Sequence, residues 1–239
     1  MSGDPVIVVS VYINRFMYRN YFENNSSLLQ SNLDCVDNRI LNRGLPAIYN
    51  EKINKYLKDD VWIYFVHEDF EIKDPLDEAV EDLNPNSIYG TFGVKLVGDF
   101  PVAYGKHLCS NKDGSNCVEA GLNIDFPEKV DAIDCQSILI HTSLLRRHNN
   151  LRFDEKLTFD LYAEDLCLNS KFELDIGIFV FPLKFQHYSH GKISKRYMDG
   201  LDYLAGKYPN FAIPGTCSFI GGGAKKLEEK FKYNIEASS

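Results

Sequence analysis

Six apolar or aromatic residues follow one another without alternation at positions 61–66, and three polar residues, His67, Glu68 and Asp69, end the run. An uninterrupted apolar run of this length predicts a strand buried on both faces. In open α/β sheets, ligands collect beyond the carboxyl ends of strands, where carboxylates can hold a metal or a metal-bound phosphate. A strand that surfaces into an ordinary polar loop gives the same pattern, so the other segments decide between the two.

Several further segments predict the rest of a sheet and its helices. Strands are predicted at residues 6–13, 129–142 and 176–183, which are rich in β-branched and aromatic residues. Helices are predicted at residues 15–23, 51–57 and from about residue 160. Residues 24–42 predict one short strand between loops, and residues 74–126, broken by Pro and Gly, predict β-ribbons and loops over one face. This order predicts an α/β fold with a mixed, mostly parallel sheet, flanking helices and a small β-ribbon region.

Composition narrows the class of protein. The 239 residues are 44% hydrophobic and 25% charged, which is typical of a soluble globular protein, and the net charge of −8 argues against a broad nucleic-acid-binding surface. No basic segment precedes the first apolar run, and that run is too short to span a bilayer. We therefore expect a cytoplasmic protein without a transmembrane segment.

The six cysteines form no Cys-x-x-Cys pair, which argues against a zinc ribbon or a thioredoxin-type site. Cys109 and Cys117 flank a turn-rich segment and are candidates for a bridge, although a cytoplasmic location favours free thiols. With no internal repeat and no low-complexity linker, the chain is predicted to form one domain at residues 1–206 and an appendage at residues 207–239, which includes a charged helical tail at 224–231.

Five segments in order resemble a known enzyme family. They are Ala47-Ile48-Tyr49-Asn50, Phe65-Val66-His67-Glu68-Asp69, Val130-Asp131-Ala132-Ile133-Asp134, Phe153-Asp154-Glu155 with residues 162–168, and a polar turn that contains His187. Over roughly residues 6–196 this pattern resembles the nucleotide-sugar glycosyltransferases of the GT-A (Rossmann-like) fold, in particular inverting family-2 enzymes of the streptomycin-biosynthesis-type branch. The resemblance implies a glycosyltransferase of the hexosyltransferase type.

The resemblance also implies roles for particular residues. Where the family usually has an Asp-X-Asp motif, this chain has His67-Glu68-Asp69, in which Asp69 matches a metal ligand. His187 matches a histidine that reaches the metal or the diphosphate, and the implied cofactor is Mn²⁺ or Mg²⁺. The implied contacts to a UDP- or GDP-type donor are Ser10, Tyr12, Asn14, Asp37, Tyr49, Asn50, His67, Glu68 and Lys192.

On the acceptor side, Asp134 is the implied contact to a saccharide or small-molecule acceptor. An inverting transfer needs a base that takes the proton of the acceptor hydroxyl. Asp165 matches the position of this base in the family, and Glu164 is the neighbouring alternative. Because adjacent carboxylates project differently from a helix, only one of the two is expected to face the sugar.

Two other classes of function remain open from the sequence. His67 in the acidic triplet, and Ala163 where the branch often has an acidic residue, would also suit a sugar- or nucleotide-binding module that has lost its catalytic activity. A nucleotidyltransferase would share the nucleotide-binding sheet, but it usually has a Gly-rich phosphate loop after the first strand, and residues 10–19 contain no glycine.

Overall fold

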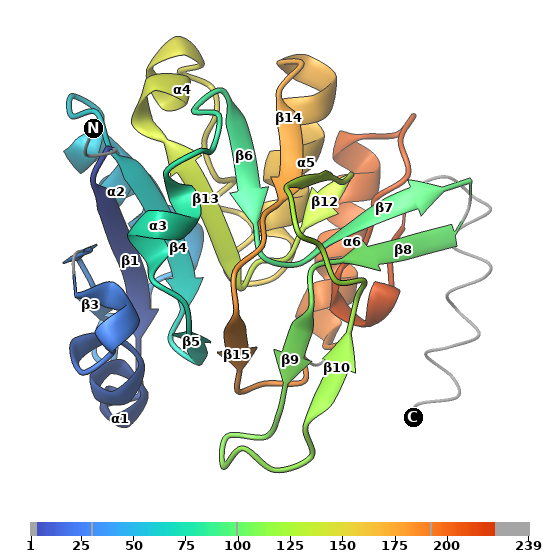
Figure 1. Ribbon diagram of the computed structural model, residues 1–239. Coiled ribbons are helices and arrows are strands. Elements are labelled where there is room, and N and C mark those ends of the chain that lie inside the picture. Colours follow the sequence, from blue (N-terminus) through green and yellow to red (C-terminus); the bar gives the residue numbers. More distant parts are fainter. Residues whose placement is uncertain (1–3, 30, 99, 192, 223–239) are drawn as a thin grey trace.

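The computed structural model describes residues 4–29, 31–98, 100–191 and 193–222. Eight strands form its central sheet (Figure 1). In spatial order they are β11 (Glu128–Lys129), β14 (Gly177–Val180), β6 (Ser87–Gly90), β13 (Ser137–His141), β4 (Trp62–His67), β1 (Val6–Tyr12) and β2 (Asn32–Leu33), with β3 (Val36–Asp37) pairing with β1 as well.

The sheet is mixed and mostly parallel. Strand β1 is parallel to β2, β3 and β4, and β6 is parallel to β14. Strand β13 runs antiparallel to both β4 and β6, and β11 runs antiparallel to β14. The predicted α/β class, with its mixed, mostly parallel sheet, is confirmed.

Helices cover both faces of this sheet, so β1 and β4 are buried along almost their whole length. One face packs against α2 (Leu45–Tyr56), α4 (Thr142–Arg147), α5 (Tyr162–Glu173) and α6 (Lys195–Lys207). The other face packs against a π-helix (Arg19–Glu23) that continues α1 (Arg15–Tyr18), against a 3₁₀ turn (Ser26–Leu28) and against α3 (Leu76–Val80). Burial on both faces explains the uninterrupted apolar run at residues 61–66.

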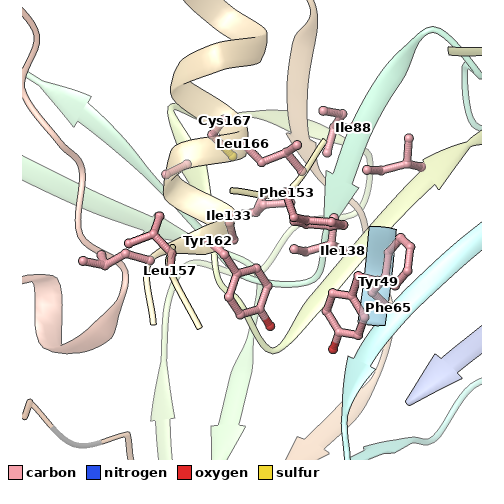
Figure 2. Close-up of a cluster of buried hydrophobic side chains, with 14 of the residues drawn as sticks. Tyr49, Phe65, Ile88, Ile133, Ile138, Phe153, Leu157, Tyr162, Leu166 and Cys167 are labelled. Carbon is pink, nitrogen blue, oxygen red and sulfur yellow. The ribbon is translucent and has the colours of Figure 1, made fainter. Parts of the chain in front are cut away.

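An aromatic cluster supports the end of β4 that carries the polar residues (Figure 2). The Tyr49 ring lies 4.6 Å from that of Phe65 and 5.8 Å from that of Tyr162, measured between centroids. Phe153 packs edge-on against all three rings. The beginning of α5 is thereby fixed relative to β4.

Two smaller sheets form the β-ribbon region. One has the order β10 (Val118–Ala120), β9 (His107–Cys109), β15 (Phe185–His187) and β5 (Phe70–Ile72), and it lies at the lower end of the central sheet in Figure 1. The other has the order β12 (Ala132–Ile133), β7 (Gly93–Val97) and β8 (Phe100–Tyr104). The thiols of all six cysteines are free.

Several elements differ from the sequence prediction. Residues 24–42 contain two short strands, and α2 begins at Leu45, six residues early, because Pro46 occupies its first turn, where the missing N–H costs nothing. Strand β6 belongs to the central sheet although it lies between turn-rich segments. Helix α6 was not predicted, yet its buried Tyr197, Leu201 and Leu204 have helical spacing.

The described residues beyond Gly206 pack on the same core as the rest of the chain. Tyr208, Ile213 and Ile220 belong to the hydrophobic cluster beneath α5 and α6. The division at residue 206 remains a prediction, and the helical tail predicted at 224–231 lies outside the described residues. Across the described ranges, no helix combines the length and the apolar character needed to cross a bilayer.

Candidate metal site and its cavity

A cavity of about 740 Å³ opens beyond the carboxyl ends of β1 and β4. Val11 and His67 line it from these two strands, and Asp69 lines it from the turn that follows β4. Glu164 at the beginning of α5 and Thr216 from beyond Gly206 lie in the wall of the same cavity. The polar residues after the buried strand therefore face a ligand-sized space.

His67, Asp69 and His187 form a group whose potential ligand atoms all lie within 4.8 Å of one another. Strand register brings His187 to this place, because β15 pairs with β5 so that His187 is opposite Phe70, and the Tyr188 N–H donates to the Asp69 carbonyl over 2.8 Å. Pairing between two short strands thus joins residues that are far apart in the sequence.

Hydrogen bonds fix the tautomer of His67. The Tyr162 hydroxyl donates to the Cys135 carbonyl over 2.8 Å, so its single proton is used. His67 Nε2, 2.9 Å from the same hydroxyl oxygen, must then donate its own proton. Nδ1 of His67 is left with a lone pair, as a metal ligand requires, and burial lowers the pKa of this imidazole.

Asp69 and His187 approach each other at the same point. Their Oδ1 and Nε2 atoms are 3.2 Å apart, yet Nε2 is buried and makes no hydrogen bond of regular geometry. Burial raises the pKa of Asp69, but His187 more than offsets this and lowers it to about 2. Burial likewise lowers the pKa of His187, and Asp69 reverses the effect and raises it. The pair needs a positive charge, which a proton on His187 or a cation can supply.

Two observations indicate that a divalent cation fits this group. Neighbouring ligands of an octahedral cation at about 2.1 Å lie about 3 Å apart, close to the separation of Oδ1 and Nε2. The other ring nitrogen of His187, Nδ1, is 3.3 Å from Nε2 of His107, whose pKa is lowered to about 4 by burial and by His187 itself. A neutral His107 can accept the Nδ1 proton and leave Nε2 free as a ligand.

The charge of the cavity wall also favours a cation. Five carboxylates line it: Glu68, Asp69, Asp134, Asp160 and Glu164. Two arginines line it as well, but Arg196 is paired with Asp160 over 2.6 Å and Arg43 is paired with Glu51. An anionic diphosphate would therefore meet a negative wall unless a cation were present.

Glu164 is the buried carboxylate of this cavity. It lies in the first turn of α5 and is 1% exposed. Its Oε1 lies 2.9 Å from the Thr216 hydroxyl, and its Oε2 accepts a weak bond from the Cys135 thiol over 3.5 Å. Burial, together with the charge of Asp134, raises the pKa of Glu164 to about 7. A carboxylate with this pKa is suited to act as a general base near neutral pH.

The neighbouring Asp165 does not line the cavity. Its Oδ1 accepts hydrogen bonds from Lys207 over 2.7 Å and from the Tyr208 hydroxyl over 3.0 Å, and its side chain is 3% exposed. Burial raises its pKa, and Lys207 opposes that rise. Asp165 therefore anchors the end of α6 to α5.

The backbone at the beginning of α5 has an uncommon conformation. Leu161, which precedes the helix and lines the cavity, has a left-handed φ of 63°. For a residue with a Cβ this conformation costs about 1 kcal/mol. It turns the chain so that Tyr162 and Glu164 both reach the site.

Most of the residues predicted to bind the donor make contacts within the protein that support the fold. Glu68 lines the cavity, but its Oε2 accepts hydrogen bonds from the N–H groups of Ile13 and Asn14, both over 2.7 Å, which ties β4 to the end of β1. The Asn14 side chain caps α1. Ser10 is fully buried, and Tyr12 stacks on Tyr18 at 4.3 Å.

The remaining predicted contacts have structural partners as well. Asp37 forms a paired hydrogen bond with Arg39. Tyr49 is a core residue, and Asn50 bonds to the backbone of Phe153. Asp134 lines the cavity, as its predicted acceptor role requires, whereas Lys192 lies outside the described residues.

Other lining residues were not anticipated from the sequence. Phe159 stacks between the His67 ring at 5.5 Å and the Arg196 guanidinium at 4.8 Å. His107 arrives on β9, which pairs with β15. No local signal in the sequence indicated His107, Phe159 or Thr216.

Comparisons with known proteins give limited similarity. No family model and no curated protein matches the chain. Among solved structures, the chain is similar to GalNAc-T7 with UDP, GalNAc and Mn²⁺, at 10% identity over 98% of this chain and 57% of that one, with a TM-score of 0.47. The chain thus spans little more than half of that protein.

Two further solved structures are similar. A glycosyltransferase involved in the glycosylation of the major capsid of PBCV-1 has 10% identity over 62% of this chain and 65% of that one, with a TM-score of 0.33. HddC from Yersinia pseudotuberculosis has 14% identity over 85% and 80%, with a TM-score of 0.34. All three scores lie below 0.5, so functional inference has to come from the cavity itself.

Proposed function

We propose that the protein is a GT-A-type glycosyltransferase that moves a sugar from a nucleoside-diphosphate donor to a hydroxyl of a saccharide or small-molecule acceptor. The observation that carries this proposal is that a metal-type group, His67, Asp69 and His187, and a buried carboxylate, Glu164, line one cavity. Cytoplasmic location, a family-2 relationship and inversion at the anomeric carbon are parts of the same proposal.

Each part of the site has a distinct role in this proposal. His67, Asp69 and His187 would hold Mn²⁺ or Mg²⁺, and the bound cation would neutralise charge on the leaving diphosphate. Glu164 in its ionised form takes the proton of the acceptor hydroxyl. The acceptor oxygen bonds to the anomeric carbon as the bond from that carbon to the diphosphate oxygen breaks, and the electron pair of that bond leaves with the nucleoside diphosphate.

We assign the base to Glu164 rather than to Asp165. Glu164 lines the cavity, and its pKa of about 7 leaves it partly ionised at neutral pH. Asp165 is held by Lys207 and Tyr208 away from the cavity wall. The sequence makes both residues candidates, and the direction of each side chain supports this choice.

The test is release of nucleoside diphosphate from a panel of UDP- and GDP-sugars with Mn²⁺, with Glu164→Gln as the comparison. We expect transfer by the wild type, and donor binding without transfer by the variant. Wild-type binding without turnover across donors and acceptors would favour the binding module instead. Absence of both binding and turnover would contradict the proposal.

A further inference from the structure

A short hairpin beyond Gly206 places Thr216 in the cavity. Ile213 and Gly222 close it through two backbone hydrogen bonds of 2.7 and 3.2 Å, and the Tyr197 hydroxyl on α6 donates to the Ile220 carbonyl over 2.6 Å. At Gly215 an added Cβ would lie 1.7 Å from the Ile220 oxygen, so only glycine fits this turn. The hairpin therefore has a fixed shape.

Thr216 lies between two carboxylates. Its side chain is 4% exposed, and its Oγ1 is 2.9 Å from Glu164 Oε1 and 2.7 Å from Asp134 Oδ2. The Thr216 N–H also donates to Glu164 Oε1 over 3.3 Å. Both acids line the cavity, and Glu164 is the base of the proposed transfer.

A hydroxyl has one proton, so Thr216 cannot donate fully to both acids. When both are ionised, one carboxylate faces the lone pairs of Oγ1 instead of its proton. When Glu164 is protonated, it can donate to Oγ1 while Oγ1 donates to Asp134, and every contact is satisfied. The arrangement therefore favours one shared proton on the pair.

We propose that Thr216 is a positioning residue that couples Glu164 to Asp134 by turning its single hydroxyl donor toward one carboxylate or the other. The inference rests on the proposed function, because it assigns to Thr216 the task of accommodating the proton that Glu164 takes from the acceptor. In the ionised state Thr216 can donate to Glu164. After proton transfer Thr216 accepts from Glu164 and donates to Asp134.

In the described part of the chain, the titratable groups around Glu164 include no cation that would compete with the coupling to Asp134. The titratable groups that act on it come from the loop before β13 (Asp134 and Cys135), from α5 (Cys167), from α6 (Tyr197) and from the hairpin (Cys217). All of these groups are neutral or negative. Lys207, the cation near the first turn of α5, is held by Asp154 and Asp165.

A double-mutant cycle tests the proposal. The Glu164 carboxyl is titrated by ¹³C NMR in protein labelled at the glutamate carboxyl carbon, with Glu164→Gln to assign the signal. Asp134→Asn is expected to lower the midpoint of the Glu164 titration by roughly one pH unit, because it removes a like charge. In a Thr216→Val background the same change is expected to give less than half of that shift, since only the field of Asp134 remains.

Thr216→Ser keeps the hydroxyl and is expected to restore the full shift. Equal shifts in the wild-type and Thr216→Val backgrounds would overturn the proposal, because Thr216 would then have only a packing role. The pH at which kcat falls on the acid side of its pH profile is expected to shift in the same way as the Glu164 titration midpoint in each variant. If the NMR cycle shows coupling but the wild type transfers no sugar, the proposed function fails while the coupling stands.

Discussion

Two adjacent carboxylates on α5 provide the sharpest test of the site. Glu164 faces the cavity and Asp165 faces Lys207. The near-isosteric changes Glu164→Gln and Asp165→Asn each remove one charge and little volume. We expect Glu164→Gln to slow transfer by orders of magnitude without loss of stability, and Asp165→Asn to lower stability and leave transfer within a few-fold of the wild type.

The magnitudes for Glu164 follow from its role and its burial. Loss of a general base typically slows the reaction by about 10²- to 10⁴-fold. A rise in pKa from 4.5 to about 7 corresponds to about 3 kcal/mol by which the ionised group disfavours folding. The pKa of Glu164 is higher in the folded than in the unfolded protein, so ionisation of this group does not lower the free energy of unfolding below about pH 4.5. The free energy of unfolding then declines as the pH rises from about 4.5 through 7. Glu164→Gln is therefore expected to be the more stable protein at pH 8 and similar to the wild type at pH 5.

The magnitude for Asp165 follows from its ion pair. Its carboxylate is 3% exposed, and Lys207 is 34% exposed and keeps Asp154 as a second partner. Breaking a fully buried pair costs about 3–5 kcal/mol, but Lys207 is partly exposed and the burial that raises the pKa of Asp165 offsets part of the gain from pairing, so the expected loss is about 2 kcal/mol. For a chain of this size that loss lowers Tm by roughly 4–8 °C.

The assays are nucleoside-diphosphate release for activity and thermal unfolding at pH 5 and pH 8 for stability. The two variants serve as controls for each other, because they differ by one position on the same helix turn. The reasoning would be refuted if Asp165→Asn lost transfer while it kept donor binding and Tm, or if Glu164→Gln remained fully active.

Further outcomes are expected elsewhere in the site. Asp69→Asn is expected to weaken Mn²⁺ binding by at least about tenfold in calorimetry without nucleotide, and unchanged affinity would exclude Asp69 as a ligand. Because the group contains two imidazoles, including that of His67, it should bind Mn²⁺ more tightly than Mg²⁺, measured by competition. Gly215→Ala is expected to lower Tm and activity together, whereas Gly206→Ala, where an added Cβ meets nothing within 4 Å, should raise stability by about 0.5–1 kcal/mol.

The sequence predicted the elements whose burial is uniform. The strand at residues 61–66 and the first strand were recognisable because both faces of each are covered, which leaves a continuous apolar signal. Strand β6 was missed because its four residues are too few to distinguish a core strand from a ribbon. Helix α6 was missed although the apolar spacing of Tyr197, Leu201 and Leu204 is helical.

The sequence could place a residue of the candidate site only where that residue directly follows a recognisable strand. Asp69 could be placed after β4 from the apolar run, but its distance to His187 depends on the pairing of β5 with β15, which strands of three residues each do not reveal in the sequence. Which of Glu164 and Asp165 faces the cavity depends on the exact first residue of α5. That boundary is set by the left-handed conformation of Leu161, for which the sequence gives no signal.

The charges of the cavity wall bear on both the metal-type group (His67, Asp69 and His187) and the acid pair (Glu164 and Asp134). With Arg43 and Arg196 already paired, the wall has no uncommitted arginine among the described residues to meet a diphosphate. In the proposed function, a cation at His67, Asp69 and His187 would assist donor binding as well as departure of the leaving group. Asp134 is the charged group that acts most strongly on Glu164. The metal-type group and the Thr216-coupled acid pair can then act separately, one on the diphosphate and the other on the acceptor proton.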